Sequence, residues 1–365
     1  MKVSRRKFLQ MSAGAGALFS LNPLYTGYKT DTFSIQSTEQ SSTLAAVRGD
    51  HLAGMTSEAL QTLGGLQMIV HEGETVFIKP NMVTLPWSQS GNCFLRGECT
   101  KTEIILTITE ECLKAGASEV IIGDGSQLYT FDWKRAITMD FSTNLVYESE
   151  RLNNKYPGIV RLACLEIDSP EWVEIPSRAP LGKIAISSLV AYADRVISVA
   201  VAKTHAWAQL TLSLKNFIGI TPMAKYAEWK PTGYWDRGKV LDHSSPQSIA
   251  QIYLDITDAV QPDLAIIDFS LGVEGDGPTT GEDNGTTVNM KDRLGSWLVL
   301  ASTDPVAADA TAARVMGHDV TQIKHLQIAH NMGLGNITES KINIVGENLS
   351  QIQVEWKPAV LKNLG

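Results

Sequence analysis

One stretch of the sequence decides the fold: Arg195-Val-Ile-Ser-Val-Ala-Val-Ala-Lys-Thr-His205. After Arg195 the run is apolar except for one serine, and it ends abruptly in a lysine, a threonine and a histidine. A continuous apolar run, unlike an alternating one, is typical of a strand that is buried on both faces. Strands of this kind belong to parallel sheets covered by helices, so this stretch predicts an α/β fold.

Four further apolar runs lie elsewhere in the chain, and helical patterns separate them. The runs cover residues 75–78, 120–122, 264–267 and 297–300, and the helical patterns cover residues 55–69, 102–115, 246–260 and 305–316. Strands alternating with helices favour a mostly parallel, Rossmann-like sheet with helices on both faces. Two stretches, near 127–180 and 221–245, show no clear period and are expected to form irregular insertions.

Charged or hydrogen-bonding residues follow each predicted strand. In open α/β sheets, ligands bind outside the carboxyl ends of the strands, so these residues are predicted to meet at one ligand site. The expected ligand-binding residues are Lys79, Asn81, Asp124, Ser126, Lys215, Asn216 and Asp304. At Asp304 a second interpretation is favoured, because Asp304 followed by Pro305 fits the start of a helix.

Lys203 and His205 are the predicted catalytic residues. They lie two apart at a strand end and therefore face the same side. Lysines suit an anionic ligand, and a histidine near neutral pH can move a proton. Nearby lysines would lower the pKa of His205 and nearby carboxylates would raise it. We expect the lysines to dominate, which leaves a neutral imidazole that acts as a general base.

A glycine-rich acidic loop, residues 272–285, contains the candidate metal ligands Glu274 and Asp276. Their carboxylates would repel an anion unless a divalent metal lies between, or unless they accept hydrogen bonds from ligand hydroxyls. A flexible acidic surface loop is the remaining alternative. The loop has neither P-loop nor EF-hand spacing, so the cofactor stays unassigned, with a divalent metal as one option.

The composition excludes several classes of protein. The 365-residue chain has a formal net charge of −8, which makes nucleic acid a poor partner. The four cysteines are too few for a disulfide scaffold and lack the repeated CxxC spacing of iron–sulfur sites, so no iron–sulfur cluster is expected in this chain. Cys93 and Cys99 lie in one loop and either form a disulfide or are inert.

The amino terminus contains Ser4-Arg5-Arg6-Lys7-Phe8-Leu9 followed by a short run of small apolar residues. This pattern resembles a twin-arginine export signal. We therefore expect a signal at residues 1–27, a polar tether at 28–44 and a single α/β domain at 45–365. The expected location is periplasmic or otherwise exported, with the twin-arginine machinery as a partner and no stable membrane span.

The second insertion includes an aromatic stretch, residues 226–235. Its aromatic rings offer large contact faces on an irregular backbone. We expect a mobile cover over the strand ends, with a packed surface loop or an oligomer contact as the alternative.

Several motifs together resemble the DUF362 family, a domain named for having no known function. They include Val76-Phe-Ile-Lys-Pro-Asn81, Gly116-Ala-Ser-Glu-Val-Ile-Ile-Gly-Asp-Gly-Ser126, Val201-Ala-Lys-Thr-His205, Leu212-Ser-Leu-Lys-Asn-Phe-Ile-Gly219, Glu274-Gly-Asp-Gly-Pro278 and Ser302-Thr-Asp-Pro-Val-Ala-Ala-Asp309. The resemblance spans roughly residues 45–335 and implies no substrate or catalytic residue. Some relatives carry an appended ferredoxin-like segment whose cysteines this chain lacks, so redox function is not implied.

Two classes of function remain open. The first is an exported enzyme that acts on a small anionic molecule by proton transfer or metal-assisted chemistry. The second is a periplasmic binding or accessory protein that uses the same cleft without turnover.

Overall fold

The computed structural model describes residues 41–87, 92–125, 128, 131–231, 233–238, 240–282 and 284–361. The predicted export signal, most of the predicted tether and Ser126 lie outside this part of the chain. The first described strand, β1 (Ser42–Gly49), begins inside the predicted tether. Residues 42–44 therefore belong to the sheet, because Leu44 is fully buried in the core.

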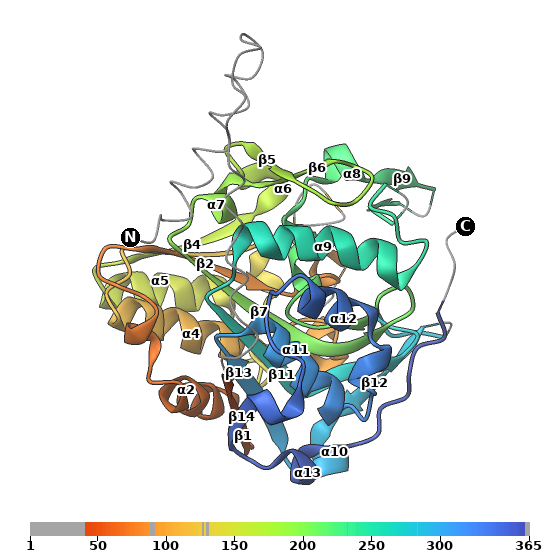
Figure 1. Ribbon diagram of the computed structural model, residues 1–365. Helices are drawn as coiled ribbons and strands as arrows, with labels where there is room; N and C mark the ends of the chain where they lie inside the picture. The colour runs from red at the N-terminus through yellow and green to blue at the C-terminus, as the bar shows by residue number, and fades with distance from the viewer. Residues whose placement is uncertain are drawn as a thin grey trace, which may run out of the picture.

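A mixed ten-stranded sheet forms the centre of the molecule, with a main order of β14-β1-β13-β11-β7-β2-β3-β4 (Figure 1). The central run from β11 to β4 is parallel, whereas β13 runs antiparallel to both of its neighbours. This confirms the predicted α/β class with a mostly parallel sheet. The strands are β2 (Thr75–Pro80), β3 (Glu119–Asp124), β4 (Ile159–Cys164), β7 (Arg195–His205), β8 (Gln209–Thr211), β11 (Leu264–Gly275), β12 (Gly285–Asn289), β13 (Trp297–Ser302) and β14 (Ile342–Gly346).

Successive side chains of the central strands enter two different hydrophobic clusters. In β7, Val196 packs in one cluster and Ile197 in the other, and both are fully buried. Helices cover both faces, as predicted (Figure 1). One face packs against α2 (Leu52–Thr62), α4 (Thr102–Lys114) and α5 (Leu145–Lys155), and the other packs against α9 (Pro246–Val260), α11 (Pro305–Val315) and α12 (Lys324–Asn331).

Helix α2 is shorter than the predicted helix at residues 55–69. It ends before Gly64 and Gly65, whose positive φ angles of 96° and 82° turn the chain out of the helix. The remaining short helices are α3 (Asn92–Leu95), α6 (Leu165–Asp168), α7 (Ser188–Ala191), α8 (Met223–Tyr226), α10 (Met290–Leu294) and α13 (Leu349–Ile352).

The two predicted insertions are more regular than the sequence indicated. Residues 127–180 include helix α5, sheet strand β4 and the hairpin strand β5 (Trp172–Pro176), which pairs with β6 (Lys183–Ser187). Strand β4 was not predicted because it lies at the sheet edge, where Ile159 is exposed and Arg161 interrupts the apolar run. In the second insertion, β9 (Glu228–Lys230) and β10 (Tyr234–Asp236) form a small hairpin.

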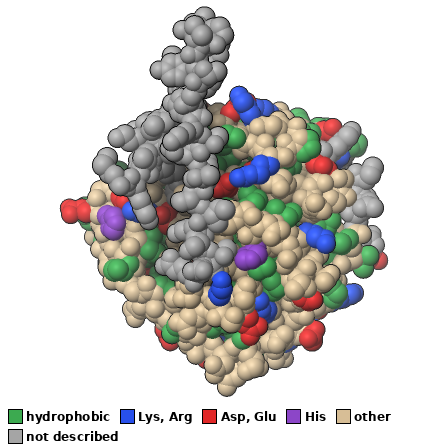
Figure 2. Space-filling view, in the orientation of Figure 1, with side chains coloured by type: hydrophobic (Ala, Val, Ile, Leu, Met, Phe, Trp, Pro, Cys, Tyr) green, Lys and Arg blue, Asp and Glu red, His purple; other side chains and the backbone are tan. Residues whose placement is uncertain are grey.

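The surface is mixed in charge. On the face shown in Figure 2, acidic and basic side chains are interspersed between apolar ones in the part of the molecule drawn in colour. Within the described residues, the structure contains no helix with the length and apolar character needed to cross a bilayer.

Candidate functional site

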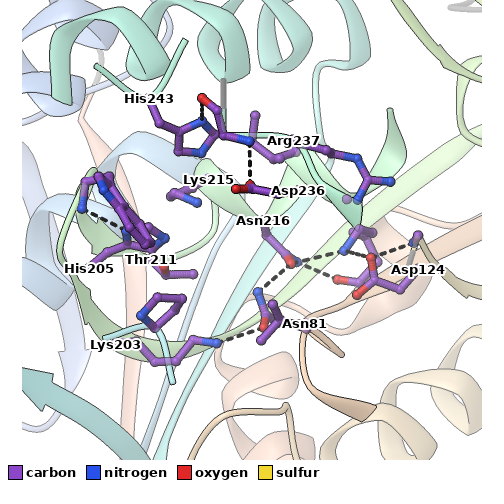
Figure 3. A pocket seen from close by; sticks show the side chains of 18 residues that line it. Asn81, Asp124, Lys203, His205, Thr211, Lys215, Asn216, Asp236, Arg237 and His243 are labelled. Atoms are coloured by element: carbon purple, nitrogen blue, oxygen red, sulfur yellow. Dashed lines mark hydrogen bonds and ion pairs between the residues drawn. The ribbon is translucent and has the colours of Figure 1, made fainter. Parts of the chain in front are cut away.

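A pocket of about 190 Å³ lies beyond the carboxyl ends of β2, β3 and β7 (Figure 3). Three successive strands of the parallel sheet therefore converge on it, where ligand sites of α/β folds lie. The structure brings together seven of the residues that the sequence singled out. They are Lys79, Asn81, Asp124, Lys203, His205, Lys215 and Asn216.

Lys79 and Asp124 form a buried ion pair on the pocket wall, with Nζ and Oδ1 2.6 Å apart. The other carboxylate oxygen accepts a hydrogen bond from the backbone N–H of Met82 at 2.8 Å. Burial lowers the pKa of Lys79, and the charge of Asp124 opposes part of that shift. Because the two charges neutralise each other, this pair shapes the wall without attracting an anion.

Two asparagines connect this ion pair to Lys203. The side-chain oxygen of Asn216 accepts hydrogen bonds from Nζ of Lys79 and from Nδ2 of Asn81, both at 3.2 Å. The side-chain oxygen of Asn81 in turn accepts one from Nζ of Lys203 at 2.9 Å. This chain of hydrogen bonds fixes the lysine heads relative to one another (Figure 3).

Lys203 and Lys215 carry the excess positive charge of the pocket. Lys203 is fully buried, and the oxygens it contacts belong to Asn81 and to the backbone carbonyl of Glu98. Lys215 has no hydrogen bond or ion pair with any described residue. Burial lowers the pKa of Lys203 to about 8, and burial together with the charge of Lys203 lowers the pKa of Lys215 to about 7. An anionic ligand would relieve this repulsion between neighbouring cations.

His205 is buried and is held in one tautomer by the turn that follows β7. Its Nδ1 accepts hydrogen bonds from the backbone N–H groups of Trp207 at 3.2 Å and Ala208 at 3.3 Å. The proton of the neutral ring therefore lies on Nε2. Burial lowers the pKa of His205 well below its usual value, and the charges of the nearby Lys215 and Lys203 lower it further. The direction agrees with the expectation, but burial and not the lysines is the main cause.

His243 also lines the pocket, and the sequence analysis missed it. Its Nδ1 lies 3.1 Å from the carbonyl oxygen of Gly238 and donates a hydrogen bond to it, because a carbonyl accepts only. The lone pair of His243 is then on Nε2. Burial and the charge of Lys215 lower the pKa of His243 to about 3. One signal was available, since this histidine lies in the insertion near 221–245, which also contains the aromatic stretch expected to cover the strand ends.

The chain between β10 and α9 supplies one side of the pocket. Asp236 and Arg237 line it, and Arg237 also pairs with the carboxylate of Glu166. Just before them, Trp229 and Trp235 of the hairpin stack edge to face with ring centres 5.6 Å apart. The expected cover therefore has a regular hairpin backbone beside the pocket. Its movement on ligand binding stays a prediction.

Three residues that the sequence singled out do not line the pocket. Asp304 is the N-cap of α11, where it accepts hydrogen bonds from two backbone N–H groups, and it also binds the hydroxyl of Ser42. The carboxylate of Glu274 pairs with Arg293 at 2.6 Å, and Asp276 accepts a hydrogen bond from the backbone N–H of Val360.

These contacts do not fit the metal centre considered for Glu274 and Asp276. A carboxylate that pairs with a guanidinium is not free to bind a cation. The first part of the glycine-rich loop continues β11, which pairs there with β12. Over the described ranges, no group of three or more His, Cys, Asp or Glu side chains is placed to hold a metal ion.

Comparison with known proteins identifies the family of this chain. Residues 76–314 match the family described as a domain of unknown function, DUF362. The chain belongs to the DUF362 family. Every residue that lines the pocket falls within the matched range, so the pocket belongs to the DUF362 domain itself.

Relatives of this DUF362 protein include the thylakoid-associated protein sll1697 of Synechocystis sp., which is 25% identical over 331 residues. That match covers 89% of this chain and 86% of the relative. Among solved structures, the lactate racemase apoprotein from Thermoanaerobacterium thermosaccharolyticum has a TM-score of 0.34 at 13% identity, and a Thermotoga maritima protein has 0.36 at 11%. The similarity covers 69% and 78% of this chain, and 54% and 60% of those two proteins.

Proposed function

We propose that this DUF362 protein is an enzyme that binds a small anionic molecule in the pocket and transfers a proton on it. One observation carries the proposal. Two lysines without a carboxylate partner among the described residues lie in the same pocket as two neutral histidines of opposite tautomer. The two lysines supply affinity for an anion. The two histidines supply a proton acceptor and a hydrogen-bond donor.

The size and lining of the pocket indicate the substrate class. A volume of about 190 Å³ is below the roughly 300–1,000 Å³ of pockets that take drug-sized molecules. Lys203 and Lys215 suit a carboxylate or phosphate group, and the carboxylate of Asp236 suits a hydroxyl. A small hydroxylated or carboxylated anion fits these groups best.

The tautomers assign different roles to the two histidines. Nε2 of His243 has a lone pair and can accept a proton, whereas Nε2–H of His205 can donate a hydrogen bond to an oxygen that gains negative charge. This assignment moves the general base from His205, where the sequence analysis placed it, to His243. Burial is the main cause of the low pKa of His243, and a bound anion would raise this pKa by offsetting the charge of Lys215.

A second candidate is a binding or accessory protein that holds the same anion without turnover. The low pKa of both histidines in the ligand-free protein favours this candidate, because neither is an effective base until the ligand is bound.

Hydrogen–deuterium exchange distinguishes the two candidates. Small hydroxycarboxylates and phosphate monoesters would be incubated with the protein in D₂O, and exchange at carbon would be followed by NMR. An enzyme exchanges a carbon-bound hydrogen of its substrate, and His243→Asn abolishes exchange while binding is largely retained, because Asn keeps a donor for the Gly238 carbonyl. Binding without exchange or product would establish the second candidate, and absence of any binding would refute both.

We further propose that the protein is exported by the twin-arginine route. The motif from Ser4 to Leu9 supports this proposal, although it lies outside the described residues.

A further inference from the structure

Two buried cysteines contact each other beside the pocket. Cys93 lies in α3, and its carbonyl oxygen accepts the backbone N–H groups of Glu98 at 3.0 Å and Cys99 at 3.3 Å. The side chains of Cys93 and Cys99 hydrogen-bond to each other, and each is at most 1% exposed. The backbone hydrogen bond from Cys99 to Cys93 thus holds the two residues side by side, which a disulfide requires.

Glu98, the residue just before Cys99, connects this pair to the pocket. The carbonyl oxygen of Glu98 accepts a hydrogen bond from Nζ of Lys203 at 2.7 Å. The carboxylate of Glu98 accepts hydrogen bonds from the hydroxyls of Thr84 and Thr280, both at 2.7 Å, so Glu98 is held through its backbone and its side chain. The hydroxyl of Thr84 also lies 3.5 Å from Sγ of Cys99. Any change at Cys99 therefore acts next to the ammonium of Lys203.

Cys99 differs from the other buried cysteines in its surroundings. Burial alone would raise its pKa, but hydrogen bonds from Cys93 and Thr84 and the charge of Lys203 bring the pKa below its usual value. Burial raises the pKa of Cys164 to about 12 and that of Cys112 higher still. Thiolates react with oxidants faster than thiols, so the lowered pKa makes Cys99 the most reactive sulfur of these three.

We propose that Cys93 and Cys99 are a redox-active dithiol that a peroxide converts to a disulfide, and that this conversion controls the charge of Lys203. The thiolate of Cys99 attacks one oxygen of the peroxide, which breaks the O–O bond and leaves a sulfenic acid and hydroxide. The sulfur of Cys93 then attacks that of Cys99, and the sulfenic oxygen leaves as water. The thiol proton of Cys93 completes this water, and the proton that Cys99 released on ionising converts the hydroxide of the first step to the second water. In total, two sulfurs are oxidised and hydrogen peroxide is reduced to two waters.

The consequence for the pocket rests on the proposed function. The negative charge of Cys99 raises the pKa of Lys203 against the effect of burial. A disulfide has no charge, so oxidation removes this support and Lys203 loses its proton at a lower pH. The oxidised protein therefore binds an anion more weakly than the reduced protein near pH 8.

Peptide mapping tests the disulfide independently of any ligand. Arg96 lies between the two cysteines, so trypsin places them in separate peptides, the second being residues 97–101. The reduced protein would be treated with hydrogen peroxide in its folded state, alkylated after unfolding and digested. We expect a cross-linked pair of these two peptides, while Cys112 and Cys164 are recovered as alkylated thiols. Cys93→Ser should lose the cross-link. Absence of the cross-link, or oxidation of Cys112 and Cys164 at the same rate, overturns the proposal.

Sulfate binding at pH 8 tests the link to Lys203. Calorimetry on the oxidised wild type should give a dissociation constant at least about threefold higher than on the reduced wild type, and Cys99→Ser should show no such response to peroxide. Equal affinities in the two forms overturn control of Lys203, even if the cross-link forms. If reduced protein does not bind sulfate at all, the proposed function fails, and the chemical shift of the Lys203 side chain in the two forms then decides the link.

Discussion

Nδ1 of His205 accepts two backbone hydrogen bonds, whereas Nδ1 of His243 donates one, so two rings that line one pocket have opposite tautomers. Each arrangement is fixed by backbone groups of the ring's own loop. The difference is therefore a property of the folded chain and precedes ligand binding.

Long-range ¹H–¹⁵N NMR should detect these tautomers directly. We expect His205 to carry its proton on Nε2 and His243 on Nδ1, with both rings neutral from pH 5 to pH 8. The reason is that burial, with the nearby cations, lowers the pKa of His243 to about 3 and that of His205 well below 6.5. His243→Asn and His205→Asn would assign the signals. A ring that gains a proton above pH 5 would contradict this description of the pocket.

Lys215 should determine both the strength and the pH dependence of anion binding. Sulfate is a suitable probe, since its charge is constant between pH 6 and pH 9. Its affinity should fall as the pH rises through about 7 and then about 8, where Lys215 and Lys203 lose their protons. Lys215→Met should weaken binding at pH 6.5 by about tenfold or more, the effect of losing a charged hydrogen bond of about 1.5–3 kcal/mol.

Lys215→Arg provides the matched control. An arginine stays charged throughout this range, so the affinity of the variant should fall only near pH 8. An affinity that rises with pH, or an unchanged affinity in Lys215→Met, would place the anion elsewhere.

Gly219 should be indispensable for stability. A Cβ atom at this position would overlap Oδ1 of Asp124 and lie 3.0 Å from Nζ of Lys79, so Gly219→Ala would separate the buried ion pair. We expect a loss of roughly 1–3 kcal/mol in the free energy of unfolding, measured with urea. Gly54→Ala, in helix α2, is the control, because its Cβ would lie 3.2 Å from Nδ1 of the N-cap His51, without overlap, and alanine favours helix. Equal effects of the two substitutions would contradict this interpretation.

Asp309 should make the protein less stable as the pH rises. Burial raises the pKa of this carboxyl group to about 8, against 3.8 as its reference. Between these values the folded state holds a proton that the unfolded state releases, so this contribution to stability is complete below pH 4 and is lost by pH 8. The slope is at most about 1.4 kcal/mol per pH unit.

Asp309→Asn isolates this contribution. The variant loses one acceptor, for the backbone N–H of Leu214, but has no proton to release. Urea unfolding at pH 5 and pH 7.5 should therefore show a smaller loss of stability in Asp309→Asn than in the wild type. Parallel losses would show that Asp309 does not hold a proton in the folded state.

The export proposal is tested by replacing Arg5 and Arg6 with lysines. Because the twin-arginine route reads the arginine pair itself, the double variant should accumulate as precursor in the cytoplasm. Cell fractionation and immunoblotting would locate the protein, with a Lys2→Arg variant as the control for a charge-conserving change. Unchanged delivery of the double variant would remove the proposal.

The sequence predicted the strands that are buried on both faces of the sheet. Strand β7 was recognisable because both of its faces are buried, so its apolar run is nearly unbroken. Strand β4 was missed because an edge strand with one solvent-facing side carries residues such as Arg161.

The site was predictable where side chains lie at the carboxyl end of a central strand, as Lys79 and Lys203 do. It was not predictable where the chain folds back over long distances. His243 reaches the pocket through an insertion, and its role depends on the carbonyl of Gly238. The ion pair of Glu274 was not predictable either, because no local pattern indicates that Arg293, nineteen residues away, contacts it.

The position of β1 has a consequence for the synthesis of this protein on the ribosome. It is the first strand of the described chain, yet its partners are β13 and β14, which are made more than 240 residues later, as the pairing of Leu44 with Ser302 shows. Translation runs from the amino end, so β1 has neither neighbour until the ribosome has nearly finished. An unpaired strand is a template for association with other chains. This chain is therefore most prone to aggregation while it is being synthesised, and less so once it has folded.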